Sequence, residues 1–313
     1  MTTVTRVFSS VLLALGLAAT AAACKDKSVL GDGGRETMGA YAAGYNEIIG
    51  RVPDFLKNYG NAVGADGPTA ESLSGNQSWM CSGIWLDLKK VDTAFSTAKS
   101  SAGKELSHLA ALADELHTAV KDIDSHRAAL CKYLDAEDYK DDDLKLAKEL
   151  DEKIRDAAGR YTKSVNAMSV ALDEIEDKQV LADIAKHEGK KNASYWYRHF
   201  SHQSKLLLKA AEREPANFPE AHDAWLSHYQ GLEKFTAEHG SKVNASFKSY
   251  QSTADRFAAA AKKLRRSVEE AGTDEEKAAA AGEGFDGLVS SYNTLLAFHE
   301  GFASLEEYGK LEE

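Results

Sequence analysis

Residues 106–134 read LSHLAALADELHTAVKDIDSHRAALCKYL. Apolar side chains recur in this segment at steps of three and four residues: Leu106, Leu109, Ala113, Leu116, Val120, Ile123, Leu130 and Leu134. This spacing predicts an α-helix with one apolar stripe that packs against other helices. Arg127 falls on the stripe, and we expect its guanidinium to reach outward to solvent. A buried ion pair with a carboxylate or a contact with a ligand are the alternatives for Arg127.

Similar stripes occur on both sides of this segment. Pro53 predicts a kink in the first helix, residues 64–78 (GADGPTAESLSGNQS) predict a loop, and the aspartates at 141–143 suit the start of a long helix. We expect helices over residues 38–59, 79–100, 106–134, from about 141 to 175, over 195–212, and around Trp225, Phe257 and Phe285. The sequence has only four prolines and few β-branched runs. It therefore predicts an all-α fold, an elongated and mostly antiparallel bundle of several long helices.

The N-terminal residues, MTTVTRVFSSVLLALGLAATAAAC (1–24), have the pattern of an export signal, in which Arg6 precedes an apolar stretch that ends in small residues. Because Cys24 follows three alanines, we expect a lipoprotein signal peptide over residues 1–23. Cleavage before Cys24 and its acylation by fatty acids such as palmitate would follow. A plain secretory signal with an incidental Cys24 is one alternative. A transmembrane anchor is the other, although the stretch is short for a span of about 20 residues.

The residues after the signal divide into a tether and a body. Residues 24–35 (CKDKSVLGDGGR) predict a flexible tether, and residues 36–313 predict a single helical-bundle domain. The formal net charge of −11 excludes nucleic acid as an expected partner, because phosphate binding depends on Lys and Arg. We expect acylated Cys24 to contact the lipid bilayer. Lys25 after the cysteine favours the outer membrane of a bacterial envelope, facing the periplasm.

The sequence contains three cysteines. With Cys24 acylated, Cys81 and Cys131 remain as a pair in an exported protein, and we predict a disulfide between them. Two buried free thiols are the alternative. The disulfide would close a loop of about 50 residues and would stabilise the fold by about 4 kcal/mol in the chain-entropy model.

Motifs for catalysis are missing from the sequence. It contains no Gly-x-Ser-x-Gly elbow and no phosphate-binding loop on a strand–helix unit, so we expect no catalytic residues, no cofactor and no enzyme. Histidine is the remaining candidate, because His199 and His202 lie three residues apart on one predicted helix face, and His222 and His228 follow on the next helix. We expect no metal site, and His199 and His202 are the candidates if one exists. Imidazoles at the surface are the simpler interpretation.

Three segments resemble the YiiG-like family of bacterial lipoproteins of unknown function. They are the signal that ends at Cys24, AYAAGYNEIIGRVPDFLKNYG (40–60) and KYLDAEDYKDDDLKLAKEL (132–150). The helix that contains Tyr292 and Asn293 is similar to the C-terminal part of the family. The resemblance implies a helical envelope lipoprotein and supplies no catalytic residues. We therefore expect a non-enzymatic binding or structural protein of the envelope, with an envelope protein as partner. A lipoprotein that binds a metal or small ligand through a histidine cluster is the alternative.

Overall fold

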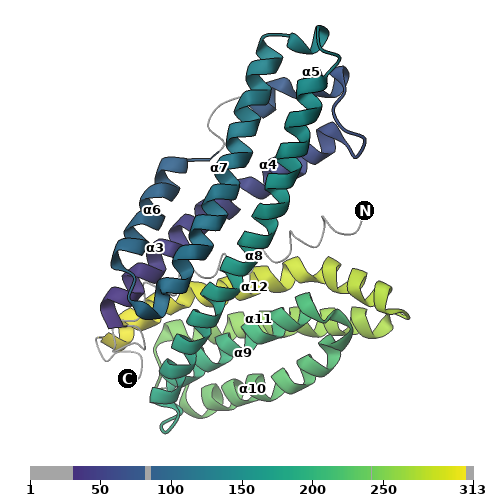
Figure 1. The fold of residues 1–313 in the computed structure, drawn as a ribbon. Helices are drawn as coiled ribbons and strands as arrows, with labels where there is room; N and C mark the ends of the chain where they lie inside the picture. The colour runs from purple at the N-terminus through teal and green to yellow at the C-terminus, as the bar shows by residue number, and fades with distance from the viewer. Residues whose placement is uncertain (1–30, 82–85, 241, 308–313) are drawn as a thin grey trace. The chain divides into compact units, whose positions relative to one another are not determined.

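The computed structural model describes residues 31–81, 86–240 and 242–307, and these residues form helices and no strand (Figure 1). The predicted all-α bundle is confirmed. The α-helices are α3 (Gly31–Ile49), α4 (Val52–Val63), α5 (Ala70–Cys81), α6 (Leu88–Ser101), α7 (Ser107–Asp135), α8 (Lys145–His187), α9 (Ala193–Arg213), α10 (Phe218–His239), α11 (Ala245–Glu270) and α12 (Asp274–Glu307). Within the described residues, each helix lacks the combination of length and apolarity that crossing a membrane requires.

The predicted signal peptide (1–23) and Cys24 lie outside the described residues, as does the tether up to residue 30. Helix α3 begins at Gly31, so residues 31–35, placed in the tether by the sequence, are helical. The Thr37 hydroxyl donates a hydrogen bond to the Gly33 carbonyl at 2.9 Å, which adds a side-chain bond to this glycine-rich first part of the helix.

The contacts between residues separate the chain into two compact units. Unit 1 contains Gly33–Asp173 and unit 2 contains the chain from Glu174 onward, so one division falls within α8. The single domain expected over residues 36–313 stays a prediction, and each unit is described by itself.

Helix α7 packs against α5 and α6 in unit 1. The apolar stripe predicted for it is confirmed, because Leu109, Leu116 and Ile123 are fully buried. The outward orientation expected for Arg127 is wrong. Its guanidinium donates to Asp124 Oδ1 at 3.0 and 3.2 Å and to the Met80 carbonyl at 3.0 Å, so Arg127 forms an ion pair with a carboxylate, and this pair is partly exposed rather than buried. The pairing compensates the guanidinium for the part of its hydration that it loses.

Three local predictions in unit 1 are corrected by the structure. The segment 64–78, expected to be a loop, contains most of α5. The Thr69 hydroxyl accepts from Ser72 N at 3.0 Å, and Ser72 Oγ accepts from Thr69 N at 2.9 Å. These reciprocal bonds cap the start of α5 in the manner of a capping box.

The helix expected over residues 79–100 is two helices. Helix α5 ends at Cys81, and α6 starts at Leu88, where the Asp87 carboxylate accepts from Lys90 N at 3.0 Å. In the same way, Pro53 does not kink one helix but lies in the first turn of α4. Proline fits there because a first-turn residue needs no backbone N–H donor.

The acidic start predicted for the long helix is confirmed. Asp142 Oδ2 accepts a hydrogen bond from Leu146 N at 3.0 Å, which satisfies one of the free amides at the N terminus of α8. The Tyr133 hydroxyl donates to the same carboxylate and lowers its pKa.

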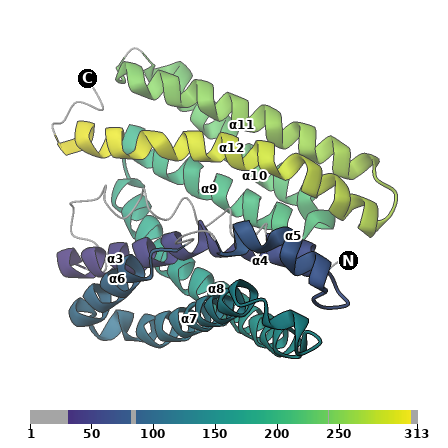
Figure 2. The same cartoon turned by 90° about the horizontal axis from the view of Figure 1, so that it is seen from above.

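Unit 2 packs its last four long helices around an aromatic core. Helix α11 lies along α12, α10 packs against α9 and α11, and α9 packs against α12 (Figure 2). The core contains the fully buried rings of Phe200, Phe218, Phe247, Tyr250, Phe257 and Phe302. Burial of such large rings supplies most of the stabilisation of a core of this kind. It also places apolar side chains against the buried face of α9, so a polar group on that face needs a hydrogen-bond partner.

Candidate functional site on helix α9

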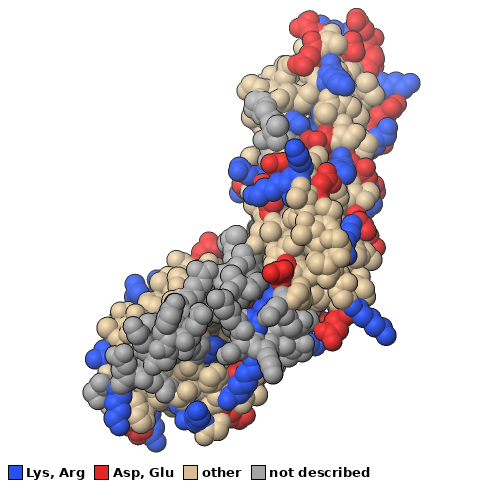
Figure 3. Space-filling model, turned by 90° about the vertical axis from the view of Figure 1, so that its left-hand side faces the viewer, with Lys and Arg blue, Asp and Glu red and all other residues tan. Residues whose placement is uncertain are grey.

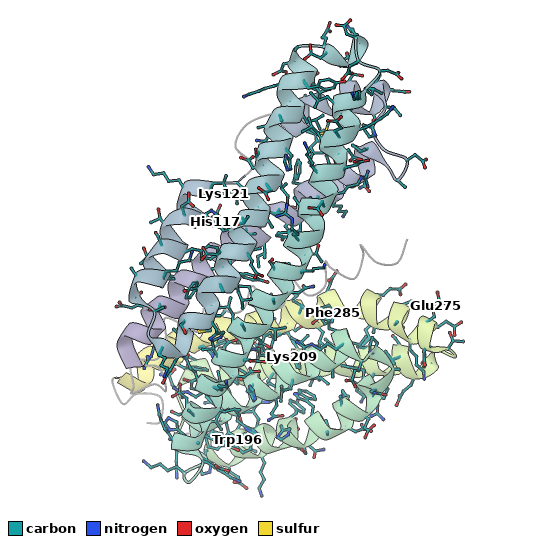
Figure 4. All side chains as sticks on the ribbon, in the orientation of Figure 1. His117, Lys121, Trp196, Lys209, Glu275 and Phe285 are labelled. Carbon is teal, nitrogen blue, oxygen red and sulfur yellow. A yellow bond between two sulfur atoms is a disulfide. The ribbon has the colours of Figure 1, made fainter. Side chains whose placement is uncertain are left out.

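Helix α9 carries polar and ionisable side chains into the interior of unit 2. Its N terminus is fixed by Asn192, whose side-chain oxygen accepts from Tyr195 N at 3.0 Å. The buried polar residues of α9 are Ser194, Ser201, His202, Ser204 and Lys205. Figure 4 labels Trp196 and Lys209, which lie toward the two ends of this helix. Because burial of polar groups is costly unless they are hydrogen-bonded, their partners decide what the helix can do.

A chain of hydrogen bonds joins α9 to α11 and α12. The Tyr250 hydroxyl donates to the Tyr197 carbonyl at 2.9 Å and lies 2.8 Å from Ser201 Oγ, and His299 Nε2 lies 2.9 Å from Ser201 Oγ. Tyr250 has one hydroxyl hydrogen, which it gives to Tyr197, so Ser201 must donate to Tyr250. Ser201 then has no hydrogen left for His299, and His299 Nε2 must donate to Ser201.

This assignment of hydrogens determines the chemistry of the serine–histidine pair. A nucleophilic serine requires a histidine nitrogen that accepts its proton. His299 instead presents a proton to Ser201, and Ser201 is 2% exposed. The contact therefore positions side chains in the core and does not activate a nucleophile.

An ionic cluster joins α9 to the part of α8 that lies in unit 2. Lys205 Nζ lies 2.5 Å from Glu176 Oε2 and 3.0 Å from Asp177 Oδ1, and Lys209 Nζ lies 2.7 Å from Asp177 Oδ2. Burial acts to raise the pKa of Asp177, but the charges and hydrogen bonds of Lys205 and Lys209 lower it. Each ammonium group of the cluster is therefore paired with at least one carboxylate.

His202 borders this cluster. Its Nδ1 lies 3.8 Å from Asp177 Oδ1, which is beyond hydrogen-bond distance. Burial lowers the pKa of His202, and the nearby carboxylate of Asp177 acts in the opposite direction. The imidazole is consequently neutral at pH 7.

A second pair of imidazoles lies between α9 and α10. His199 Nε2 is 2.9 Å from His228 Nδ1, and the Tyr195 ring stacks on the His199 ring with centroids 4.9 Å apart. Burial, with a further contribution from His228, lowers the pKa of His199 to about 4. Burial also lowers the pKa of His228. Both rings are therefore neutral at pH 7, which is the form that binds metals.

The structure separates the histidines that the sequence grouped. His199 contacts His228, whereas His202 approaches Asp177, and His222 lies beside Asp223 and Trp225. Within the described part of the chain, no group of three or more histidine, cysteine or acidic side chains is arranged to hold a metal ion.

The predicted cysteine pair lies in unit 1. Cys81 at the end of α5 is joined to Cys131 of α7 in a disulfide, with Cα atoms 5.5 Å apart. Sequence reasoning missed the ionic cluster and the Ser201–His299 contact. The adjacent acids Glu176-Asp177 and the i, i+4 lysines of α9 were the available signals for the cluster, because such residues are rarely buried without partners.

Comparison with known proteins gives the chain its family. Neither a curated protein nor a solved structure matches it. The model of one family, described as a protein of unknown function (DUF3829), matches residues 34–298. This match covers α4 to α11 completely, and with them most of both units. The chain therefore belongs to the DUF3829 family.

Proposed function

We propose that this protein is a lipid-anchored lipoprotein of the bacterial envelope, whose helical bundle acts as a non-enzymatic binding or structural body. The main support for the proposal is that the reactive side chains on α9 are bonded to partners in the core. Ser201 accepts a hydrogen bond from His299, and Lys205 is paired with Glu176. Groups committed in this way to partners in the core support packing and specificity of the fold rather than turnover of a substrate.

Attachment through Cys24 is the second part of the proposal. The export signal and the cysteine at its end support acylation. Acidic and basic side chains are interspersed on the face drawn in Figure 3, and the net charge is −11. Such a surface has little attraction for anionic lipid or nucleic acid, so the acyl chains would supply the membrane affinity. We further infer a YiiG-like member of the family, placed in the outer membrane and facing the periplasm.

An envelope protein is the partner that this arrangement suits. A chain tethered at its N terminus explores a thin layer near the membrane, and this confinement raises its effective concentration toward other proteins of that layer. Weak contacts can then be sufficient for function, without the large apolar interface of a permanent complex.

Affinity purification tests the proposal. The full-length chain with a C-terminal tag would be isolated from detergent-solubilised envelopes, alongside the Cys24→Ser variant. We expect a defined envelope protein to co-purify with the wild type and to be depleted with Cys24→Ser, because that variant is not tethered. Recovery of no partner, together with turnover of a cell-wall or lipid substrate by the purified chain, would contradict the proposal.

A further inference from the structure

The contact between His199 and His228 differs from the other polar contacts of α9, because two neutral imidazoles meet there nitrogen to nitrogen. The ring centroids are 4.9 Å apart and the ring planes are inclined by 66°, so the rings do not stack. The two facing nitrogens are 2.9 Å apart. Each residue is partly exposed, in contrast to buried Ser201 and Lys205. Each of the two residues is therefore in contact with solvent.

One hydrogen atom lies between the two facing nitrogens. With both rings neutral, one facing nitrogen carries a proton and the other offers a lone pair, which gives an N–H···N hydrogen bond. If that proton moves to the remote nitrogen of its own ring, both facing nitrogens offer lone pairs. The pair then presents two ligands to a cation and releases no proton.

We propose that His199 Nε2 and His228 Nδ1 bind one divalent transition-metal cation of the copper or nickel type in adjacent coordination positions. With metal–nitrogen bonds of about 2.0–2.1 Å and a right angle at the metal, the two nitrogens lie about 2.9 Å apart. The observed separation is 2.9 Å. A tetrahedral angle would require about 3.3 Å. The spacing suits the right angle of the square-planar or octahedral geometry that copper and nickel adopt with imidazole ligands, and it is also the length of the N–H···N hydrogen bond that joins the two rings without a metal.

Two aromatic rings and one lysine surround His199 of the pair. The Tyr195 ring stacks on His199, and the Trp196 ring contacts the same imidazole edge-on, with centroids 6.1 Å apart. Trp196 is held close to α10 because Gly231 has no side chain, and a Cβ atom there would clash with the indole. These rings limit movement of His199. The positive charge of Lys191 lies near enough to lower the pKa of His199, and it also disfavours a cation at this position. Water would fill the remaining coordination positions.

Copper binding to the full-length chain in detergent, produced without a histidine tag, tests this site. We expect one Cu²⁺ per chain by calorimetry. Electron spin-echo spectroscopy of the wild type should show modulation from the remote nitrogens of two imidazoles. The variants His199→Gln and His228→Gln should each weaken binding by about tenfold or more, since each 1.4 kcal/mol of lost coordination is a factor of ten.

Two matched variants serve as controls. His222→Gln removes a histidine from the same helix as His228, and His202→Gln removes the second histidine of α9. Both should leave the copper affinity unchanged. Modulation from fewer than two imidazoles in the wild type would overturn the proposal without the need for a variant. Equal copper affinity in the wild type, His199→Gln and His228→Gln would also overturn it. A loss of copper affinity in His202→Gln, with none in His199→Gln and His228→Gln, would do the same. Copper binding that persists in Cys24→Ser would show that this site is independent of the proposed anchoring.

Discussion

Removal of the disulfide between Cys81 and Cys131 should destabilise unit 1 by about 4 kcal/mol. The two cysteines are 50 residues apart in the sequence. A cross-link over a loop of this length lowers the entropy of the unfolded chain by about 14 cal/mol/K, which is about 4 kcal/mol at 25 °C. Domains have total stabilities of about 5–15 kcal/mol. The loss would therefore remove a large part of the free energy of unfolding of the unit that contains α5 and α7.

Urea unfolding followed by circular dichroism measures this loss in the full chain. The comparison is between the wild type and the double variant Cys81→Ser/Cys131→Ser, which leaves neither thiol of the pair. We expect an earlier transition for the double variant, and a similar shift for the wild type after reduction. Reductant should not change the double variant, which is the control. A loss well below about 2 kcal/mol, the lower end for native disulfides, would refute the reasoning. Two free thiols at Cys81 and Cys131 in the unreduced wild type would refute it as well.

Three further predictions concern packing and charge. Gly44→Ala should cost about 1–3 kcal/mol by urea unfolding, because the new Cβ would clash with a phenyl ring of α6. Gly39→Ala, where nothing lies within 4 Å, should stabilise α3 by up to about 1 kcal/mol, and equal effects of the two substitutions would contradict the packing. Lys205→Met removes the ammonium group that lies 2.5 Å from Glu176 Oε2 and should cost about 3–5 kcal/mol, whereas a loss under about 1 kcal/mol would show that the buried charges are not coupled. Stability should fall as the pH drops from 6.5 toward about 4, because His199 stays neutral when folded and binds a proton when unfolded. The fall should be smaller for His199→Gln, and an identical pH dependence would contradict the assignment.

The helices that the sequence predicts well are those with a strong apolar stripe. Residues 106–134 predict α7 correctly, because apolar residues spaced three and four apart fall on one face only if the segment is an α-helix. Helix α5 is missed, since only Leu73 and Met80 are buried among its residues and its composition is that of a loop. Its start is set by the reciprocal bonds of Thr69 and Ser72, a local capping pattern that periodicity does not detect.

The site is less predictable than the fold for a physical reason. Spacing along α9 indicates which side chains share a face, and on that basis it grouped His199 with His202. It does not indicate which neighbouring helix each side chain meets. The partner of His199 is 29 residues away and the partner of Ser201 is 98 residues away. Such pairs depend on how the helices pack, and buried lysines are unexpected from composition because charged residues usually lie at the surface.

Attachment of the chain to the membrane at Cys24 is the central claim about its function, and intact-mass analysis of the mature protein tests it most directly. The protein would be extracted from the membrane fraction of cells that express the full chain. We predict a chain that begins at Cys24 and carries the mass of a diacylglyceryl group and an amide-linked fatty acid. The Cys24→Ser variant should lack that mass and leave the membrane fraction. A mature chain with an unmodified Cys24, or one that begins at another residue, would contradict the account.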